Sequence, residues 1–228
     1  MKKIIVFSGA GISAESGLKT FRDSDGLWEN YNIYEVATPE AWKKDPKLVL
    51  EFYNARRKQV LNAIPNNSHI ALAKLETDFD IQIITQNIDD LHERGGSTKI
   101  LHLHGEILTS KSTYNDEQYK IKGPELNIGD LCKNNSQLRP DIVWFGEAVP
   151  NMVVAEKLCK DADILIIIGT SLTVYPAANI IDFVPYNCEK FLIDPKEISM
   201  VNIKNLTIIK ENASIGIDIL IKKLHKKS

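Results

Sequence analysis

Residues 4–14 read Ile4-Ile5-Val6-Phe7-Ser8-Gly9-Ala10-Gly11-Ile12-Ser13-Ala14, a short apolar run that leads directly into a turn of small residues. Gly9, Gly11 and Ala14 match the pattern GxGxx(G/A) of nucleotide-binding folds. The first glycine permits a tight turn, the second lets backbone approach a pyrophosphate, and the third small residue lets helix and strand pack closely. The stretch therefore predicts a strand, a phosphate-binding turn and a helix, although small residues also suit any tight strand-to-helix turn.

Further apolar runs rich in β-branched residues lie at Ile81–Thr85, Ile100–Leu103, Ile164–Ile168, Phe191–Ile193 and Leu206–Ile209. They are apolar throughout rather than alternating, which is typical of strands buried on both faces of a parallel sheet. Helical patterns lie between them, at Pro46–Leu61, His69–Leu75 and Ser214–Lys223, the last with Ser214 as its expected N-cap. This alternation predicts an α/β protein with a Rossmann-like, doubly wound parallel sheet.

Two segments interrupt the alternation of strands and helices. Residues 28–67 are helical or loop-like with no convincing strand, and residues 109–138 are polar and poorly periodic. We interpret both as insertions that form a smaller lobe, within a single unit spanning residues 1–228. The Rossmann-like lobe then comprises residues 1–27, 68–108 and 139–228, and the cleft between the lobes is the natural ligand site.

Composition excludes several classes of function. The chain has 228 residues with 43% hydrophobic and 25% charged residues, and its net charge of -2 gives no electrostatic footprint for nucleic acid. The run Ile164–Ile168 is too short to span a bilayer. Three cysteines without a CxxC pair favour a reducing compartment. We expect a cytoplasmic monomer with no membrane or direct nucleic-acid partner.

The turn after the first strand predicts a nucleotide but not hydride transfer. A dehydrogenase would place an acidic residue about 20 residues further on, at the end of a second strand. In this chain residues 20–28 read TFRDSDGLW, which is not a strand pattern.

At this point the sequence resembles the sirtuin family over nearly its whole length, and fits best the bacterial members and relatives that remove acidic acyl groups. Each motif is short, but they occur together, in order and at compatible spacings. The motifs are Gly9–Ser13, Glu15–Gly17, Thr20–Arg22, Gly26–Trp28, Thr85–Asp89, Leu91-His92, Leu103–Glu106, Arg139-Pro140, Val143–Glu147 and Gly169–Ser171.

The resemblance implies an enzyme that consumes NAD as a co-substrate and removes acyl groups from protein lysine. In the family reaction the acyl oxygen captures the ribose of NAD as nicotinamide leaves, and a base deprotonates a ribose hydroxyl. The products are free lysine, nicotinamide and O-acyl-ADP-ribose. Acylated lysine-containing proteins or peptides are thus the implied partners.

A base of this kind needs a pKa near neutrality, which suits histidine. His104 lies at the end of a predicted strand, where open α/β sheets place their sites. A lone histidine is more often structural, and only the match to the family's His-Gly element makes His104 the expected catalytic base. We interpret His102 as structural, and His92 resembles a position that orders the site.

The resemblance also assigns the contacts with NAD. Asn87, the second expected catalytic residue, would lie near the nicotinamide ribose, and Asp89 would bind the carboxamide; as turn residues, both also suit purely structural roles. The expected NAD-binding set is Gly9, Ala10, Gly11, Ile12, Glu15, Phe21, Arg22, Gln86, Asn87, Ile88, Asp89, Gly169, Thr170, Ser171, Val174, Asp194 and Ala213.

Two segments are expected to bind the acylated peptide. Val143–Glu147 resembles the strand that pairs with the peptide backbone, with Val143, Phe145, Gly146 and Glu147 as contacts. Tyr53 and Arg56, spaced i, i+3 on a predicted helix, resemble the Tyr-x-x-Arg of members that accept succinyl- or malonyl-lysine. A guanidinium and a phenol hydroxyl would together grip a carboxylate. On spacing alone, a charged helix surface is the simpler interpretation.

The family's structural zinc site is not preserved in this sequence. Family members hold four cysteines between the His-Gly and Arg-Pro elements, whereas residues 106–138 contain only Cys132. Ser112 stands at one lost ligand and Asn135 at the partner of Cys132. One thiolate cannot build a structural zinc site, so we expect no metal.

Two other functions remain open. An NAD glycohydrolase or ADP-ribosyltransferase could use the same nucleotide site, but would not need the peptide segment or Tyr53 and Arg56. A silent NAD sensor would not need His104.

Overall fold

The computed structural model describes residues 1–19, 27–28, 31–170, 172–196 and 203–226. Within this part of the chain, the main element is a six-stranded parallel sheet with the order β11-β10-β9-β1-β4-β5. All six predicted apolar runs form its strands, which confirms the expected parallel sheet. The strands are β1 (Lys3–Ser8), β4 (Asp80–Thr85), β5 (Ile100–His102), β9 (Ile164–Ile168), β10 (Glu189–Ile193) and β11 (Leu206–Ile209).

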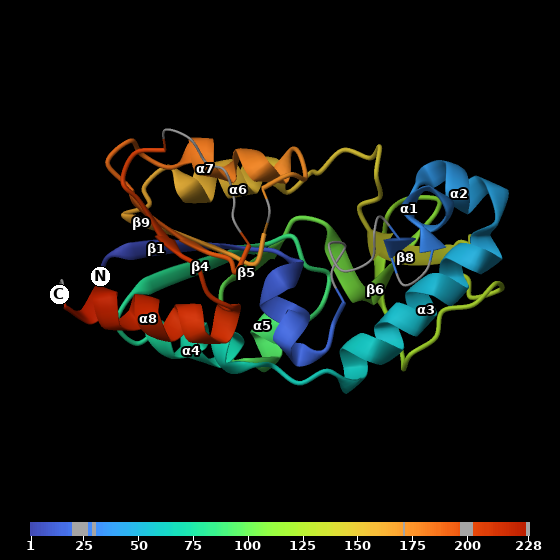
Figure 1. Cartoon of the computed structure of the whole chain (residues 1–228). Helices are drawn as coiled ribbons and strands as arrows, with labels where there is room; N and C mark the ends of the chain where they lie inside the picture. Colours follow the sequence, from blue (N-terminus) through green and yellow to red (C-terminus); the bar gives the residue numbers. More distant parts are fainter. Residues whose placement is uncertain (20–26, 29–30, 171, 197–202, 227–228) are drawn as a thin grey trace.

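Helices cover both faces of this sheet (Figure 1). Side chains of β1 alternate between two cores, with Ile4 and Val6 in one and Ile5 and Phe7 in the other. Because both faces of each strand are buried, the strands carry no polar alternation, and the doubly wound prediction is confirmed. One face carries α4 (Asn67–Leu75), α8 (Ala213–His225) and the 3-10 helix η1 (Ala10–Ser16), and the other carries α6 (Met152–Cys159), η3 (Ala177–Asn179) and α7 (Ile180–Phe183).

The start of α8 differs from the prediction. The helix begins at Ala213, so Ser214 lies in its first turn and is not its N-cap. Asn212 occupies the cap position without a side-chain hydrogen bond. Instead, the carboxylate of Glu15 accepts a hydrogen bond of 2.9 Å from the backbone N–H of Ser214. An acidic group from η1 thus supplies the negative charge that a helix N-terminus favours.

A smaller group of elements lies beside the parallel sheet (Figure 1). The expectation of no strand in residues 28–67 was wrong, because β2 and β3 form a two-residue ladder. The expected boundary between residues 108 and 109 falls within β6, and the division into lobes stays a prediction. The elements are β2 (Leu27–Trp28), β3 (Tyr31–Asn32), α1 (Ile33–Val36), α2 (Pro39–Lys44), α3 (Pro46–Asn62) and the antiparallel sheet β7 (Gln118–Lys120), β6 (Gly105–Ser112) and β8 (Leu138–Ile142).

Two buried polar side chains on α3 hold the segment that follows β6. Arg57 is fully buried and donates to the carbonyls of Ile107 (2.8 Å) and Pro124 (3.0 Å). Asn54 donates to the carbonyl of Leu126 (3.0 Å) and accepts from its N–H (2.9 Å), while the Arg57 guanidinium donates to the Asn54 oxygen (2.7 Å). These bonds pair backbone groups that would otherwise be buried without partners. The loop is therefore fixed to α3 by a polar clamp formed by Asn54 and Arg57.

Among the described residues, no helix combines the length and the apolar character needed to cross a bilayer.

Replacing Asn54 with Ala should destabilise the protein by about 2–3 kcal/mol, because it leaves the Leu126 backbone groups without a buried partner and removes one of the three acceptors of the Arg57 guanidinium. Thermal and urea unfolding would measure the change. Lys58→Ala is the matched control, since Lys58 lies on the exposed face of α3 and pairs with Glu125 at the surface; its cost should stay below about 0.5 kcal/mol. Equal effects of the two changes would contradict the clamp.

Candidate active site

A cleft of about 510 Å³ opens at the carboxyl edge of the parallel sheet, between that sheet and the smaller group of elements. Its walls come from the segments after β1, β4, β8 and β9 and from α3. The structure thus brings together segments that are far apart in sequence. The expected site residues that line the cleft are Ala10, Gly11, Tyr53, Arg56, Gln86, Asn87, Ile88, Asp89, His104, Val143, Phe145, Gly146, Glu147, Gly169, Thr170 and Val174.

Backbone-to-backbone contact of two glycines forms one end of the cleft. The Gly11 N–H donates to the Gly169 carbonyl at 2.8 Å, and a Cβ on Gly11 would lie 2.7 Å from the Gly169 Cα. Gly169 has a positive φ of 65°, and a Cβ there would overlap the backbone nitrogen of Ile12. β1 and β9 are neighbours at the point where the strand order reverses, which is where such sheets bind nucleotides. Only glycine at both positions lets the two turns approach this closely.

Five expected NAD contacts do not line the cleft. Ile12 and Ala213 are buried in the core beneath it, and Glu15 caps α8. Asp194 is buried after β10, where its carboxylate accepts the Lys196 N–H at 2.9 Å. Gly9 lies at the base of the turn and donates its N–H to the Ile168 carbonyl. Phe21, Arg22 and Ser171 lie outside the described residues.

A network of polar side chains fixes the turn after β4. The Asn87 amide donates to the Ser13 hydroxyl at 3.1 Å, and Ser13 in turn donates to the Asp89 carboxylate at 3.1 Å. Asp89 is buried, and burial raises its pKa above the ordinary value. Ser13 also lines the cleft but was not among the expected site residues. Its position within the small-residue turn was the only signal in the sequence.

Two histidines hold the carbonyls of the same turn. His104 Nδ1 lies 3.0 Å from the Gln86 carbonyl, and His102 Nδ1 lies 2.8 Å from the Asn87 carbonyl. Because a carbonyl only accepts, each Nδ1 carries a proton. In His104 this leaves Nε2 as the basic nitrogen, and burial lowers the His104 pKa below 6.5.

The environment of His102 has the opposite effect on its pKa. Burial alone would lower this pKa, but the 2.8 Å hydrogen bond and the charge of Glu93, together with the Asn87 carbonyl, raise it above 6.5. Both ring nitrogens of His102 are thus held by hydrogen bonds, one to the Asn87 carbonyl and one to the Glu93 carboxylate, which gives this histidine a structural role.

Two side chains of α3 face the cleft. Tyr53 is fully buried and accepts a 3.1 Å hydrogen bond from the Trp144 indole. Arg56 is 6% exposed, and its guanidinium donates to the Gln59 side chain and the Lys19 carbonyl. The interpretation of this segment as an exposed charged surface is therefore wrong for Arg56.

The expectation of a strand at Val143–Glu147 was wrong, because β8 ends at Ile142 and the chain then turns. Gly146 adopts a positive φ of 90°, which an extended strand does not allow. The N–H groups of Val143, Phe145 and Glu147 donate within the chain, to the carbonyls of His104, Ala37 and Trp144 respectively.

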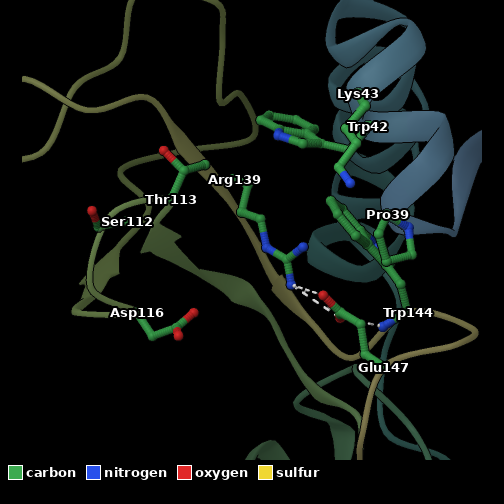
Figure 2. A pocket seen from close by; sticks show the side chains of 9 residues that line it. All are labelled: Pro39, Trp42, Lys43, Ser112, Thr113, Asp116, Arg139, Trp144 and Glu147. Carbon is green, nitrogen blue, oxygen red and sulfur yellow. Dashed lines mark hydrogen bonds and ion pairs between the residues drawn. The ribbon is translucent and has the colours of Figure 1, made fainter.

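Arg139 and Glu147 stabilise this turn (Figure 2). The Glu147 carboxylate accepts from Arg139 at 2.9 and 3.0 Å and from the Trp144 backbone N–H at 2.8 Å. A second, smaller pocket of about 270 Å³ lies against these residues. It is lined by Pro39, Trp42, Lys43, Ser112, Thr113, Asp116, Arg139, Trp144 and Glu147.

Residues around Cys132 do not form a metal site. The Ser112 hydroxyl donates to the Cys132 sulfur at 3.3 Å, and the cysteine packs in an apolar cluster with Leu50, Leu126 and Leu138. Within the described ranges, no group of three or more His, Cys, Asp or Glu side chains could hold a metal ion. A family zinc ion does not fit this set of side chains, because it would find one thiolate.

Comparison with known proteins identifies the family. The model of the Sir2 family matches residues 9–176. A protein of Helicobacter pylori named NAD-dependent protein deacylase is 53% identical over 224 residues, covering 98% of each chain. A protein of the same name from Bacteroides thetaiotaomicron is 49% identical and covers 96% of each.

Solved structures agree with this result. A Sir2 homologue in complex with NAD is 38% identical, covers 99% of this chain and 90% of its own, and has a TM-score of 0.89. A mutant Sir2 homologue in complex with ADP-ribose is also 38% identical, with coverage of 99% and 93% and a TM-score of 0.90. The chain belongs to the Sir2 family, whose members are the sirtuins.

The two histidines that hold the turn after β4 should titrate on opposite sides of pH 6.5. We expect the His104 ring to titrate below this value because it is buried, and the His102 ring above it because it is paired with Glu93. NMR titration of the ring protons would measure both values, with His104→Gln and His102→Gln spectra used for assignment. A His104 midpoint above that of His102 would refute the assigned protonation states.

Proposed function

We propose that this chain is an NAD-dependent protein-lysine deacylase that removes succinyl or malonyl groups and also acetyl groups. The observation that carries the proposal is the shared cleft: the glycine contact, His104 and the pair Tyr53 and Arg56 all border one space. A nucleotide site, a base and a cation for an acidic acyl group are thus within one cavity.

The glycine contact supports binding of NAD. A Cβ on Gly11 or Gly169 would overlap the backbone of the other turn, so glycine lets the two turns close together beside Ala10 and Thr170, which line the cleft. We assign Ala10, Gly11, Gly169 and Thr170 to the phosphates and riboses. NAD would supply the ADP-ribosyl group that receives the acyl group, with nicotinamide as the leaving group.

The turn after β4 would bind the nicotinamide end. Asn87 and Asp89 are held by Ser13, so their side chains are oriented before any ligand binds. Asp89 lines the cleft, and its carboxyl oxygens can accept hydrogen bonds from the N–H groups of an amide. Gln86 and Ile88 line the cleft beside them and complete this subsite.

His104 is the proposed general base. Its Nδ1–H is committed to the Gln86 carbonyl, so Nε2 is free to accept the proton of a ribose hydroxyl. The lowered pKa keeps the ring neutral at physiological pH, which a base requires. Binding alone would not need this arrangement, which argues against a silent NAD sensor.

Arg56 is the proposed anchor for the acyl carboxylate. A guanidinium that is largely excluded from water binds a carboxylate more strongly than an exposed one does, since neither water nor salt screens the pair. Tyr53 can add a hydrogen bond because burial raises its pKa and keeps the phenol protonated. Both side chains border the cleft that contains His104, as a desuccinylase requires.

The turn at Val143–Glu147 would contact the peptide that carries the acylated lysine. Since three of its backbone N–H groups donate within the chain, we expect contacts from Phe145, which is 41% exposed, and from Gly146 rather than an added strand along the whole segment.

Matched succinyl-lysine and acetyl-lysine peptides, with and without NAD, test the proposal by mass-resolved product analysis. NAD-dependent loss of both groups with formation of O-acyl-ADP-ribose is expected, and His104→Ala should abolish it. Arg56→Met should raise the KM for the succinyl peptide about 10- to 100-fold, through loss of a charge-assisted contact, with little effect on the acetyl peptide.

Lys58→Met is the matched control for Arg56→Met, because it removes a cation from the same helix outside the cleft. It should leave both peptides unaffected. An unchanged ratio of desuccinylation to deacetylation in Arg56→Met would rule out the acidic-acyl assignment. NAD breakdown without peptide deacylation would favour a glycohydrolase.

We also propose that the enzyme works without zinc. Metal analysis of the purified protein should find well below one zinc ion per chain, and a chelator should change neither the melting temperature nor the activity. The reason is that Cys132 is paired with a serine rather than with further thiols. Stoichiometric zinc, or inactivation by the chelator that zinc reverses, would show this proposal to be wrong.

A further inference from the structure

Trp144 lines the cleft beside Tyr53 and also borders the second pocket. Its side chain is almost fully buried at 2% exposure, and its indole Nε1–H donates to the Tyr53 hydroxyl at 3.1 Å. The indole is a donor only, so the phenol oxygen must be the acceptor. This bond joins the turn after β8 to α3, two elements that meet only in the folded protein.

The indole has a fixed orientation. The Arg139 guanidinium lies 3.8 Å from the centre of the Trp144 ring, and the Trp42 ring lies at a centroid distance of 5.8 Å. Arg139 is itself held by the Glu147 carboxylate, which also accepts the Trp144 backbone N–H (Figure 2). Cation–π contact and aromatic packing add to these bonds. The ring therefore cannot rotate its N–H away from Tyr53 without disrupting this group.

The direction of this hydrogen bond determines what the Tyr53 hydroxyl can do. A phenol has one proton, and an oxygen that accepts from the indole must point that proton elsewhere. Accepting one hydrogen bond also strengthens the hydroxyl as a donor through polarisation. Because Arg56 borders the same cleft, an acyl carboxylate held there would receive the phenol proton.

We propose that Trp144 is a positioning and specificity-determining residue, which orients the Tyr53 hydroxyl as a donor to the carboxylate of an acidic acyl group. This inference rests on the proposed desuccinylase function. It predicts that Trp144 affects acidic acyl groups more than acetyl groups, since an acetyl group has no carboxylate to receive the proton.

Trp144→Phe removes the N–H and keeps an aromatic ring against Arg139. It should raise the KM for the succinyl peptide about three- to tenfold relative to the KM for the acetyl peptide, the usual effect of one lost hydrogen bond. Trp42→Phe is the control, because Trp42 packs on the same ring on the side of the second pocket. It should leave the succinyl to acetyl ratio unchanged.

A double-mutant cycle with Tyr53→Phe separates positioning from general damage. If Trp144 acts through the Tyr53 hydroxyl, then adding Trp144→Phe to Tyr53→Phe should have no further effect on the succinyl KM. The NMR resonance of the Trp144 indole N–H should also shift in Tyr53→Phe, independently of activity. Additive effects in the cycle, or an equal loss with both peptides, would overturn the inference.

The outcomes for the two proposals are distinguishable. An enzyme that desuccinylates in an Arg56-dependent manner, yet shows an unchanged succinyl KM in Trp144→Phe, would overturn the role of Trp144 alone. An enzyme that removes acetyl but not succinyl groups would overturn both.

Discussion

The backbone contact between Gly11 and Gly169 is the constraint on which the rest of the site depends. The two turns belong to β1 and β9, which are neighbours in the sheet, and their 2.8 Å hydrogen bond joins them at the point where the strand order reverses. A side chain at either position would push the turns apart and fill the space beside them. The contact therefore holds the two turns together at one end of the cleft. Glu15, which follows the first turn, extends the same segment to the N-terminus of α8 and so ties the turn to the core.

Sequence patterns predicted the fold well because burial on both faces leaves a strong signal. Uninterrupted apolar runs such as Ile164–Ile168 have few interpretations other than a parallel strand, and all six runs pair as expected. The cap of α8 was mispredicted because the stabilising carboxylate comes from Glu15, 199 positions away in the chain. The turn at Val143–Glu147 was mispredicted because Trp144 packs in a cluster with residues of α1 and α3, while Gly146 takes a positive φ that ends the strand. In each case a tertiary contact replaced the local pattern.

The residues of the candidate site also fall into two groups, those that a local pattern predicts and those whose contacts depend on the tertiary structure. The position of His104 and Asn87 at the cleft could be predicted because the carboxyl edge of a parallel sheet collects residues next to strand ends, whereas their expected roles rested on the family resemblance. His102 was expected to be structural, but the contacts of Ser13 and Trp144 could not be predicted, since each depends on a partner from another element. Ser13 links the first turn to Asp89, and Trp144 links the turn after β8 to Tyr53. A hydroxyl or an indole carries no signal of its partner in a single sequence.

Helix α3 carries both the residues that bind the loop after β6 and two of the residues that border the cleft. One face carries Asn54 and Arg57, which bind the loop after β6, and the adjacent face carries Tyr53 and Arg56, which border the cleft. A helix places residues i and i+3 on one side. Tyr53 and Arg56 therefore share one side of α3, and Asn54 and Arg57 share the side next to it. The loop bound by Asn54 and Arg57 belongs to the region where other sirtuins hold zinc, in our interpretation of the sequence. Hydrogen bonds from a helix can replace a metal in fixing such a loop, because both satisfy buried polar groups and restrict the same backbone. The clamp also ties the loop to the helix that would recognise the acyl group, so loss of the metal ligands need not loosen the acyl pocket.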